Sequence, residues 1–389
     1  MTRHRDGNRL TLLRNGTEFF PALEVAIDAA AREIFLETYI FATDATGQRI
    51  AAALARAAAR GVAVHVLIDG FGSREYLAQG LGGRLRGGGV AALVYRPDLA
   101  PMRLRRWRLR RLHRKLAVID ARVAFIGGIN LLDDEHLPGD PAPRLDFAVR
   151  IEGPLLADIV PEARRLWRLV ARTQLRRVPS GAEPVPVVAA ACGDERAAFL
   201  VRDNLRHRGD IEDAYLAAIR AARTEIVIAC AYFFPGRGFR RALREAAQRG
   251  VRVTLLLQGR VEYVLQHYAT RALYGDLLAS GVRIHEYARS YLHAKVAVID
   301  GRWATVGSSN IDPLSFVLAR EANVVVEDDG FAAALRSALD TAFATGAREL
   351  SPADWRRERL PARLMTWACY GIVRLIAGMT GYARMEEFR

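Results

Sequence analysis

Two histidine–lysine pairs give this sequence its clearest chemical signal. His113 and Lys115 are separated by one residue, and His293 and Lys295 repeat the same spacing. On a β-strand, residues i and i+2 project from the same face, about 6–7 Å apart. An imidazole and an ammonium at this spacing can point together at one small anion. The repeated pair therefore predicts a site that holds an anionic group between two histidines.

The choice of lysine at these positions is unusual in this chain. Of the 57 basic residues, 55 are arginine, and only Lys115 and Lys295 are lysine. A lysine in an apolar strand is costly unless it is paired. A guanidinium is planar and wide, whereas a compact ammonium can contact a single phosphoryl oxygen. This indicates two positions at which an arginine is not accepted.

The segment around each pair has the form His-x-Lys-x4-Asp, followed by a glycine turn that ends in asparagine. Asp120 and Asp300 have the opposite parity to the histidines, so we expect them to face away from the site and to fix the turn that follows. Asn130 ends the turn GGIN, and Asn310 ends GSSN. Both amides are candidate ligands of a phosphate.

Each histidine also needs a partner that fixes its tautomer. The segments DFAVRIE and EANVVVE align with each other, and each begins with an acid, Asp146 and Glu321. These two carboxylates are the candidates for orienting the histidines. The alternative is that each is only a solvated start of a strand.

A metal site is the competing interpretation, since histidine and aspartate can ligate zinc or magnesium. An ammonium two residues from each histidine would repel a divalent cation, and no cluster has zinc-ligand spacing. Cys192, Cys230 and Cys369 show no paired spacing, which favours a reduced cytosolic setting. We therefore expect no metal and no cofactor.

The elements that must position these residues occur twice. Residues 58–70 resemble 247–259, and residues 112–120 resemble 292–300. The pattern predicts helices and buried strands in alternation, and hence a largely parallel sheet covered on both faces. The predicted helices are 21–32, 47–60, 211–222 and 237–249, and the strands include 34–41, 62–69, 226–234 and 251–258.

The predicted fold class is α/β, with two homologous α/β/α halves related by a pseudo-twofold axis and one active site at the seam. The first half is residues 1–172 and the second is 199–350. A linker rich in proline is expected at 173–198. The tail from 351 to 389 has no counterpart in the first half and is expected to associate with a membrane.

The duplicated HxKxxxxD motif with its G-G/S-x-N turn resembles the phospholipase D superfamily over nearly the whole chain. Segments such as FLETYIF, VLIDGFGS and DFAVRIEGP more narrowly resemble short bacterial cardiolipin synthases without N-terminal membrane spans. The resemblance implies that His113 attacks phosphorus to form a phosphohistidine and that His293 is the acid and base. It also implies that both lysines and both asparagines stabilise phosphoryl charge, and that acids stand at Asp146 and Glu321.

The charge of the chain points to an anionic partner. The formal net charge is +14, and hydrophobic residues make up 51% of a chain that is too apolar to be disordered. The run RLRRWRLRRLHRK at 103–115 suits anionic headgroups, although a solvated face or a nucleic-acid backbone are alternatives. The expected membrane contacts are Arg103, Arg105, Arg106, Trp107 and Arg108.

The C-terminal segment 364–383 has one charged residue, Arg374. We expect an interfacial or re-entrant membrane helix, with a helix docked on the core or a true span as alternatives. This tail favours a lipid substrate over DNA. No apolar signal-peptide core begins the sequence, and nothing before residue 360 approaches a membrane span.

The predicted function is a cardiolipin synthase-like phosphatidyltransferase. It moves a phosphatidyl group, expected to come from phosphatidylglycerol, to the alcohol of another phospholipid. The expected location is the bacterial cytoplasmic membrane, peripheral or monotopic on its cytoplasmic face, with no nucleic acid and no obligate protein partner. The alternatives are a phospholipase D-type hydrolase or nuclease that uses water, and a non-catalytic anion-binding module.

Overall fold

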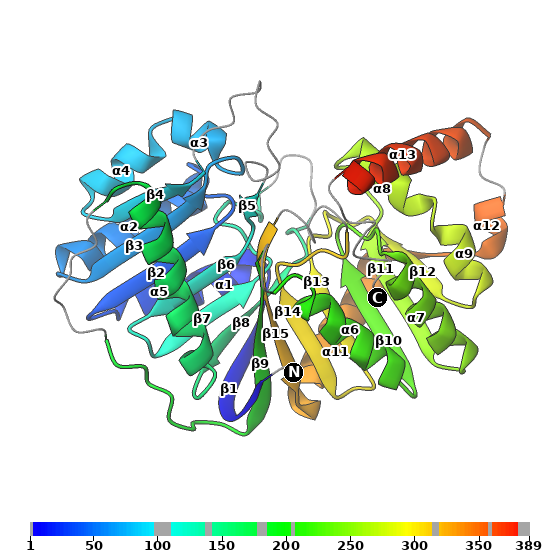
Figure 1. Ribbon diagram of the computed structural model, residues 1–389, viewed down its shortest axis with the longest axis horizontal. Helices are drawn as coiled ribbons and strands as arrows, with labels where there is room; N and C mark the ends of the chain where they lie inside the picture. The colour runs from blue at the N-terminus through cyan, green and yellow to red at the C-terminus, as the bar shows by residue number, and fades with distance from the viewer. Residues whose placement is uncertain are drawn as a thin grey trace.

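One mixed β-sheet runs through both halves of the computed structural model (Figure 1). Within the described residues the sheet holds 16 strands, and helices cover it on both faces. The described residues are 3–96, 110–136, 142–176, 185–203, 207–312, 319–356 and 360–379.

The first half contributes the strands on one side of the seam. Across the sheet they follow the order β4-β3-β2-β6-β7-β8-β1, and β5 pairs with β15 of the other half. Their bounds are β1 (His4–Arg14), β2 (Glu33–Thr38), β3 (Ala63–Asp69), β4 (Ala91–Tyr95), β5 (Arg111–Leu112), β6 (Lys115–Ile119), β7 (Val123–Gly127) and β8 (Phe147–Glu152).

The second half repeats this order as β12-β11-β10-β13-β14-β15-β9, with β16 added at its outer edge. Strands β1 and β9 pair antiparallel at the seam and join the halves into one sheet. The arrangement confirms the predicted α/β fold of two homologous halves. The bounds are β9 (Glu195–Arg202), β10 (Glu225–Cys230), β11 (Arg252–Gln258), β12 (Arg283–Tyr287), β13 (Lys295–Ile299), β14 (Trp303–Gly307), β15 (Ala319–Glu327) and β16 (Ala347–Leu350).

The prediction of a largely parallel sheet was wrong. Besides the short β5–β15 pair, only β2-β3-β4 and β10-β11-β12 run parallel among the described strands. Strands β6, β7, β8 and β1, like their counterparts in the second half, pair antiparallel. The reason is the short connection between β6 and β7, residues 120–122, because a turn of this length can join only antiparallel strands.

The helices predicted from the repeat are present, with shifted ends. The helix expected at 21–32 begins earlier, at Asn15, and ends at Asp28. Gly61 and Gly250, predicted as helix stops, have φ of +89° and +88°, a conformation that glycine adopts readily. The helices are α1 (Asn15–Asp28), α2 (Ala45–Ala59), α3 (Arg74–Ala78), α4 (Leu81–Gly87), α5 (Leu156–Thr173), α6 (Asp210–Ala221), α7 (Arg237–Gln248), α8 (Val264–Arg271), α9 (Tyr274–Ala279), α11 (Asp329–Gly346), α12 (Pro352–Arg356) and α13 (Leu360–Met379).

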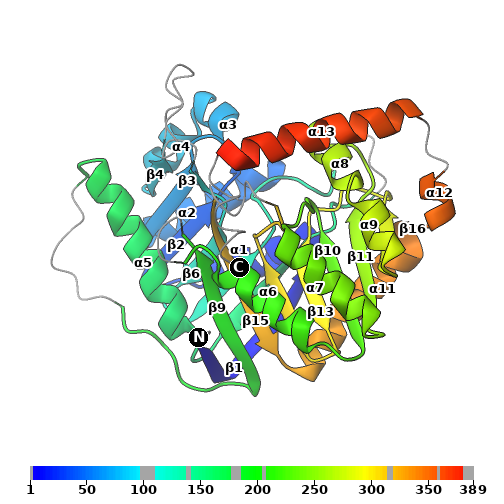
Figure 2. The same cartoon turned by 45° about the vertical axis from the view of Figure 1, so that its right-hand side comes forward.

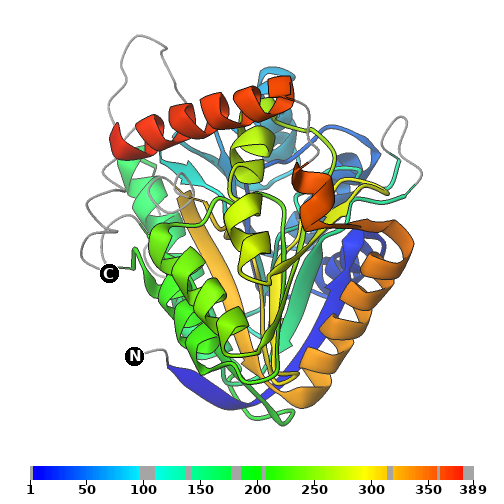
Figure 3. The same ribbon diagram turned by 90° about the vertical axis from the view of Figure 1, so that its right-hand side faces the viewer.

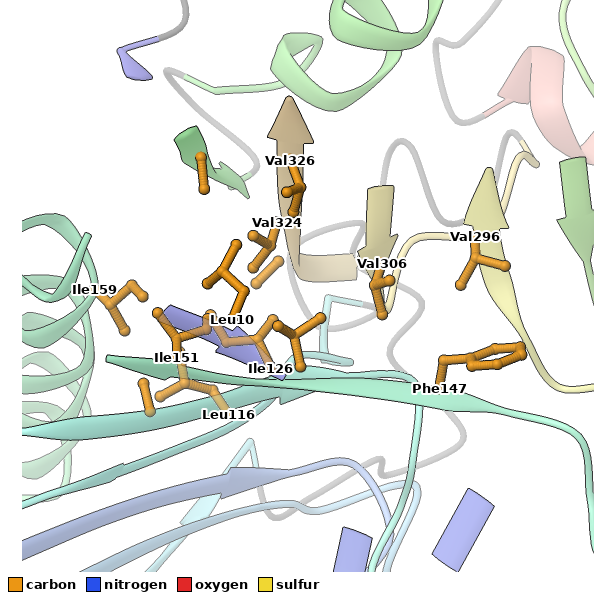
Figure 4. Packing of buried hydrophobic residues seen from close by; sticks show 14 of the residues in the cluster. Leu10, Leu116, Ile126, Phe147, Ile151, Ile159, Val296, Val306, Val324 and Val326 are labelled. Carbon is orange, nitrogen blue, oxygen red and sulfur yellow. The ribbon is translucent and has the colours of Figure 1, made fainter. Parts of the chain in front are cut away.

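An apolar core crosses the seam and fixes the two halves relative to each other. Figure 4 shows Leu10, Leu116 and Ile151 of the first half in one cluster with Val306 and Val324 of the second. Helices α5 and α11 contribute to this shared cluster, whereas α1 and α2 cover the outer face of the first half. Since interiors pack at nearly crystalline density, a site built across this seam is held rigidly.

The linker and the tail extend beyond the repeat. Strand β9 begins at Glu195, inside the linker predicted at 173–198. Helix α13 lies across α8 and has no counterpart in the first half (Figure 2, Figure 3). Residues 380–383 of the predicted membrane segment lie outside the described residues. Of the helices that the structure describes, none has both the length and the apolar character that a bilayer crossing requires.

Candidate active site

A cavity of about 460 Å³ lies at the seam, and both motif histidines line it. His113 enters from the first half just before β6, and His293 enters from the second half just before β13. Asn130 and Asn310, at the ends of the two glycine turns, also line the cavity. The structure thus brings four predicted site residues to one place.

Each histidine is held by a carboxylate from the opposite half. The Nδ1 atom of His113 lies 3.1 Å from Oε2 of Glu321, and Nδ1 of His293 lies 2.6 Å from Oδ2 of Asp146. Both carboxylates are buried. When Nδ1–H is donated to a carboxylate, Nε2 is the ring nitrogen that remains free to react. Neither half on its own contains a complete histidine–carboxylate pair.

The backbone explains this exchange between the halves. Strand β5 pairs parallel with the start of β15, and the amide of His113 donates to the carbonyl of Arg320, next to Glu321. In the same way the amide of His293 donates to the carbonyl of Leu145, next to Asp146. The register of these short pairings places each ring beside its carboxylate.

Lys115 and Lys295 lie beneath the histidines and do not line the large cavity. The Nζ atom of Lys115 donates to the carbonyl of His113 at 2.9 Å, and Lys295 donates to the carbonyl of His293. Their exposed fractions are 5% and 1%. Burial, with the charge of Lys295, lowers the pKa of Lys115 to about 7. Burial also lowers the pKa of Lys295. Because each lysine nitrogen is bonded to the backbone of its own histidine, both lysines lie close behind the cavity lining.

The motif aspartates lie outside the cavity and hold the chain in a different place from the one predicted. Asp120 accepts the backbone N–H groups of residues 31–33 at 2.8–2.9 Å. Asp300 accepts those of residues 223–225 at 2.8–2.9 Å. They therefore fix the turns before β2 and β10, and the expectation that they fix the turn that follows was wrong. The reason is the antiparallel pairing, since the end of β6 meets the start of β2, where backbone donors are unpaired.

Glu321 is surrounded by groups that favour its charged form. The hydroxyl of Ser308 donates to its Oε2 atom at 2.6 Å, and a guanidinium nitrogen of Arg202 lies 3.5 Å from Oε1. Burial raises the pKa of Glu321, but His113 and then Arg202 outweigh this effect and hold it below its usual range. The surroundings of Glu321 therefore favour its charged form next to His113.

Asp146 differs from Glu321 in the kind of donor that surrounds it. Its Oδ1 atom accepts the backbone N–H of Phe147 at 2.9 Å. The position that corresponds to Ser308 is Gly128, where an added Cβ would meet Oδ1 of Asp146 at 2.2 Å. Burial raises the pKa of Asp146 to about 6, against the lowering effect of Lys295. The pKa of Asp146 is thus raised while that of Glu321 is lowered, so the two carboxylates differ in proton affinity.

The surroundings of both histidines disfavour the charged ring. Burial lowers the pKa of His113, and the charge of Lys115 lowers it further. Burial and Lys295 lower the pKa of His293 well below its usual range. Two imidazoles whose Nδ1 atoms are held by carboxylates, and whose Nε2 atoms are free, suit nucleophilic attack and proton transfer at an anionic phosphoryl group.

Other residues at the site were missed by the sequence reasoning. Asp69 accepts the N–H of Leu112 at 2.7 Å, and Gln258 donates to the carbonyl of Leu292, so both hold the residue before a motif histidine. The aligned repeat could have found this pair, because it places a polar residue at the end of both strands. Tyr39, whose ring lies 4.8 Å from that of His113, has no such signal.

A further set of residues that line the cavity was also missed, because the two copies of the repeat carry different residue types at these positions or do not align there. They are Arg144, Tyr232, Glu262, Gln266 and Thr270. The predicted membrane contacts Arg103, Arg105, Arg106, Trp107 and Arg108 lie outside the described residues. Within the described ranges no group of three or more His, Cys, Asp or Glu residues could hold a metal ion.

Comparisons with known proteins agree on one family. The family described as cardiolipin synthase, PLD-like domain, matches residues 23–157 and 215–342. Cardiolipin synthase B of Escherichia coli K12 is 41% identical over 356 residues, which cover 89% of this chain and 83% of the relative. Cardiolipin synthase B of Salmonella typhi is 40% identical over 373 residues, 93% of this chain and 85% of the relative.

The solved structures agree with the fold. The crystal structure of phosphatidylserine synthase from Haemophilus influenzae Rd KW20 superposes with a TM-score of 0.68 at 15% identity and covers 95% of this chain and 94% of its own. At this identity the likeness concerns the fold alone. It fits the continuous two-half sheet described above.

Proposed function

The chain belongs to the cardiolipin synthase family with phospholipase D-like domains, and from this membership and the geometry of the site we propose how it acts. It is a phosphatidyltransferase of the phospholipase D superfamily. The proposed donor is phosphatidylglycerol, and the proposed acceptor is the alcohol of a second phospholipid. With a second phosphatidylglycerol as acceptor, the products are cardiolipin and glycerol.

In the proposed first step, Nε2 of His113 attacks the phosphorus of the donor. A P–N bond forms and the P–O bond to the headgroup breaks. The imidazolium of His293 gives its proton to the departing oxygen, which leaves as the alcohol. The surroundings of His293 disfavour the charged ring in the free protein, but a bound phosphodiester anion favours it, so proton uptake accompanies substrate binding.

In the second step, the acceptor hydroxyl attacks the phosphohistidine. The neutral His293 takes the hydroxyl proton, a P–O bond forms, and the P–N bond to His113 breaks. The protein returns to its starting state, and no metal is needed to balance either step. The two lysines and two asparagines stabilise the charge on the phosphoryl oxygens.

The different carboxylate partners support this assignment of roles. The surroundings of Glu321 favour its charged form, which suits a nucleophile whose ring gains positive charge as the P–N bond forms. Asp146 has a pKa raised to about 6, nearer to that of a histidine, which suits a pair that takes up and releases a proton. The observation that carries the proposal is that both histidines line one cavity, each held by the carboxylate of the other half.

We also propose that the protein lies peripherally on the cytoplasmic face of the bacterial membrane. Helix α13 buries Cys369 and Val373 against the core, while large apolar side chains on its other side are exposed. Such an amphipathic helix binds at the acyl–headgroup boundary. The net charge of +14 favours anionic lipid. The exposed apolar residues of α13, called its outer face below, are Leu364, Met365, Trp367, Ile372 and Leu375.

The experiment is an assay of the purified chain on vesicles of phosphatidylglycerol labelled in the headgroup glycerol, with plasmid DNA in parallel. We expect cardiolipin and an equal amount of free glycerol, also in EDTA, and intact DNA. His113→Asn should abolish both products. His207→Asn is the matched control, because this half-exposed histidine pairs with Asp210 away from the cavity. Phosphatidic acid or cut DNA without cardiolipin would refute the transfer.

A further inference from the structure

The cavity lining contains one group of hydrogen-bonded polar side chains besides the histidines and asparagines. The hydroxyl of Tyr232 donates to Oε2 of Glu262 at 2.7 Å, and a guanidinium nitrogen of Arg144 lies 3.5 Å from Oε1 of the same carboxylate. Apolar side chains such as Phe71 and Phe233 also line the cavity. We call Arg144, Tyr232 and Glu262 the polar wall.

The polar wall is fixed in place and largely buried. The side chains of Glu262 and Arg144 are 21% and 18% exposed. The guanidinium of Arg144 also stacks 5.5 Å from the ring centroid of Tyr291. Glu262 lies on the connection from β11 to α8 and lines the cavity. A carboxylate held in this way needs no rearrangement to receive a ligand.

Beside the polar wall is a small side cavity of about 20 Å³, which shares Tyr232, Glu262, Gln266 and Thr270 with the large one. A space of this size holds about one water molecule, or one hydroxyl group of a ligand. The remaining lining of the side cavity includes Gln258, Arg260 and His267, together with the apolar Ala231 and Leu257. The space is narrow and offers several hydrogen-bonding groups, so it suits a hydroxyl better than an alkyl chain.

The chemistry of Glu262 selects the kind of ligand. A carboxylate has about four acceptor positions, and among the described residues Tyr232 and Arg144 occupy two of them. The others can accept O–H donors. The negative charge repels a phosphate, so the group that fits here is uncharged and carries hydroxyls. This description applies to a polyhydric alcohol such as the glycerol headgroup.

The polar wall lies on the side of the cavity where alcohols would exchange protons. The amide of Ala231, next to Tyr232, donates to the carbonyl of Ala294, next to His293. The wall is thus joined by the backbone to the histidine that protonates the leaving alcohol and deprotonates the attacking one. Both alcohols occupy the same place in turn, because the second step reverses the direction of the first.

We propose that Glu262, held by Tyr232 and Arg144, is a hydroxyl-binding subsite that selects a polyhydric alcohol over a simple one. The inference rests on the proposed phosphatidyl transfer and names the class of alcohol that the site accepts. Glu262 binds the hydroxyls that do not react, and so places the reacting hydroxyl next to His293.

The test is a competition between glycerol and propan-1-ol for the phosphatidyl group. The full chain acts on phosphatidylglycerol vesicles with both alcohols present, and labelled phosphatidylglycerol and phosphatidylpropanol are measured. The ratio of the two products depends only on the second step. In Glu262→Gln the preference for glycerol should fall about ten-fold, the effect of losing one hydrogen bond to a charged group. The absolute rate of transfer to propan-1-ol does not enter the test, because Glu262 also meets the glycerol that leaves in the first step.

Two further variants complete the design. Tyr232→Phe removes the hydroxyl that holds the carboxylate and should give a smaller loss of preference. Glu245→Gln is the matched control, since Glu245 lies on the surface of α7 and pairs with Arg241. An unchanged glycerol preference in Glu262→Gln would refute the subsite alone. Hydrolysis without alcohol transfer by the unaltered chain would refute the proposed function itself.

Discussion

Ser308 offers a direct way to perturb the proposed nucleophile without touching it. Its hydroxyl donates to Glu321 at 2.6 Å, and Glu321 in turn holds Nδ1 of His113. Ser308→Ala removes one donor from a carboxylate that is fully buried. The pKa of Glu321 should rise, and the Glu321–His113 pair should take up a proton at higher pH than before. A protonated pair cannot attack phosphorus.

The size of the effect follows from the hydrogen bond. A bond to a charged group contributes about 1.5–3 kcal/mol, and 1.36 kcal/mol corresponds to one pH unit. The acid limb of log(kcat/KM) should therefore move up by about 1–2 pH units, which is about a 10- to 100-fold loss of rate on that limb. On the alkaline side the rate should be unchanged, because there the pair is already deprotonated in both proteins.

The assay is the pH dependence of kcat/KM for cardiolipin formation, with a thermal melt of each protein. Ser290→Ala is the matched control: it removes another buried hydroxyl, which donates to the carbonyl of Pro143. It should lower stability without moving the acid limb. If the limb of Ser308→Ala coincides with that of the unaltered chain, Glu321 does not set the protonation of the nucleophile.

Three other predictions address the lysines, the tail and the motif aspartates. Lys115→Arg or Lys295→Arg should lower turnover on vesicles at least about 10²-fold. The larger side chain should also lower the melting temperature by overpacking the buried position. Near-normal turnover would mean that only the long-range charge of the lysine matters. The double variant Leu364→Gln, Trp367→Gln should weaken flotation with anionic vesicles at least about ten-fold. Its melting temperature should stay unchanged, because both side chains are exposed. Unaltered flotation would mean that the outer face of α13 does not bind the membrane. Asp300→Ala should cost about 1 kcal/mol of unfolding free energy by urea titration. Backbone donors hold the pKa of Asp300 below its ordinary value, against the effect of burial. The contribution of Asp300 to stability should therefore be lost as pH falls through that lowered pKa. If Asp300→Ala lost the same stability at every pH, this role would be contradicted.

Much of the fold could be predicted from the repeat alone. Two copies of His-x-Lys-x4-Asp at equivalent places imply two homologous halves, and two such halves share one site most simply at a seam. Aligning the same copies pointed to Asp146 and Glu321, which the structure places against the histidines. The alignment could not show that each carboxylate serves the opposite half, because this depends on pairing between strands far apart in the chain.

Other features could not be read from spacing. Parity along a strand correctly put Asp120 and Asp300 outside the cavity, but it did not show which backbone donors they would meet, since that is set by the neighbouring strand. The lysines turn back to the carbonyls of their own histidines, a local geometry that strand periodicity does not contain. Glu262 lies on a connection that differs between the halves, so the repeat carried no signal for it.

The central claim is that the phosphatidyl group passes through His113. The most direct measurement uses His293→Asn, in which the departing and attacking alcohols lose their acid and base, with vesicles of phosphatidylglycerol labelled at phosphorus. After brief reaction the protein is digested at alkaline pH, which preserves the acid-labile P–N bond, and the labelled peptide is identified by mass spectrometry. The account predicts label on the peptide that contains His113 and none when His113 is also replaced by asparagine. Label on another residue, or product formation at the normal rate with no labelled protein at any time, would contradict it.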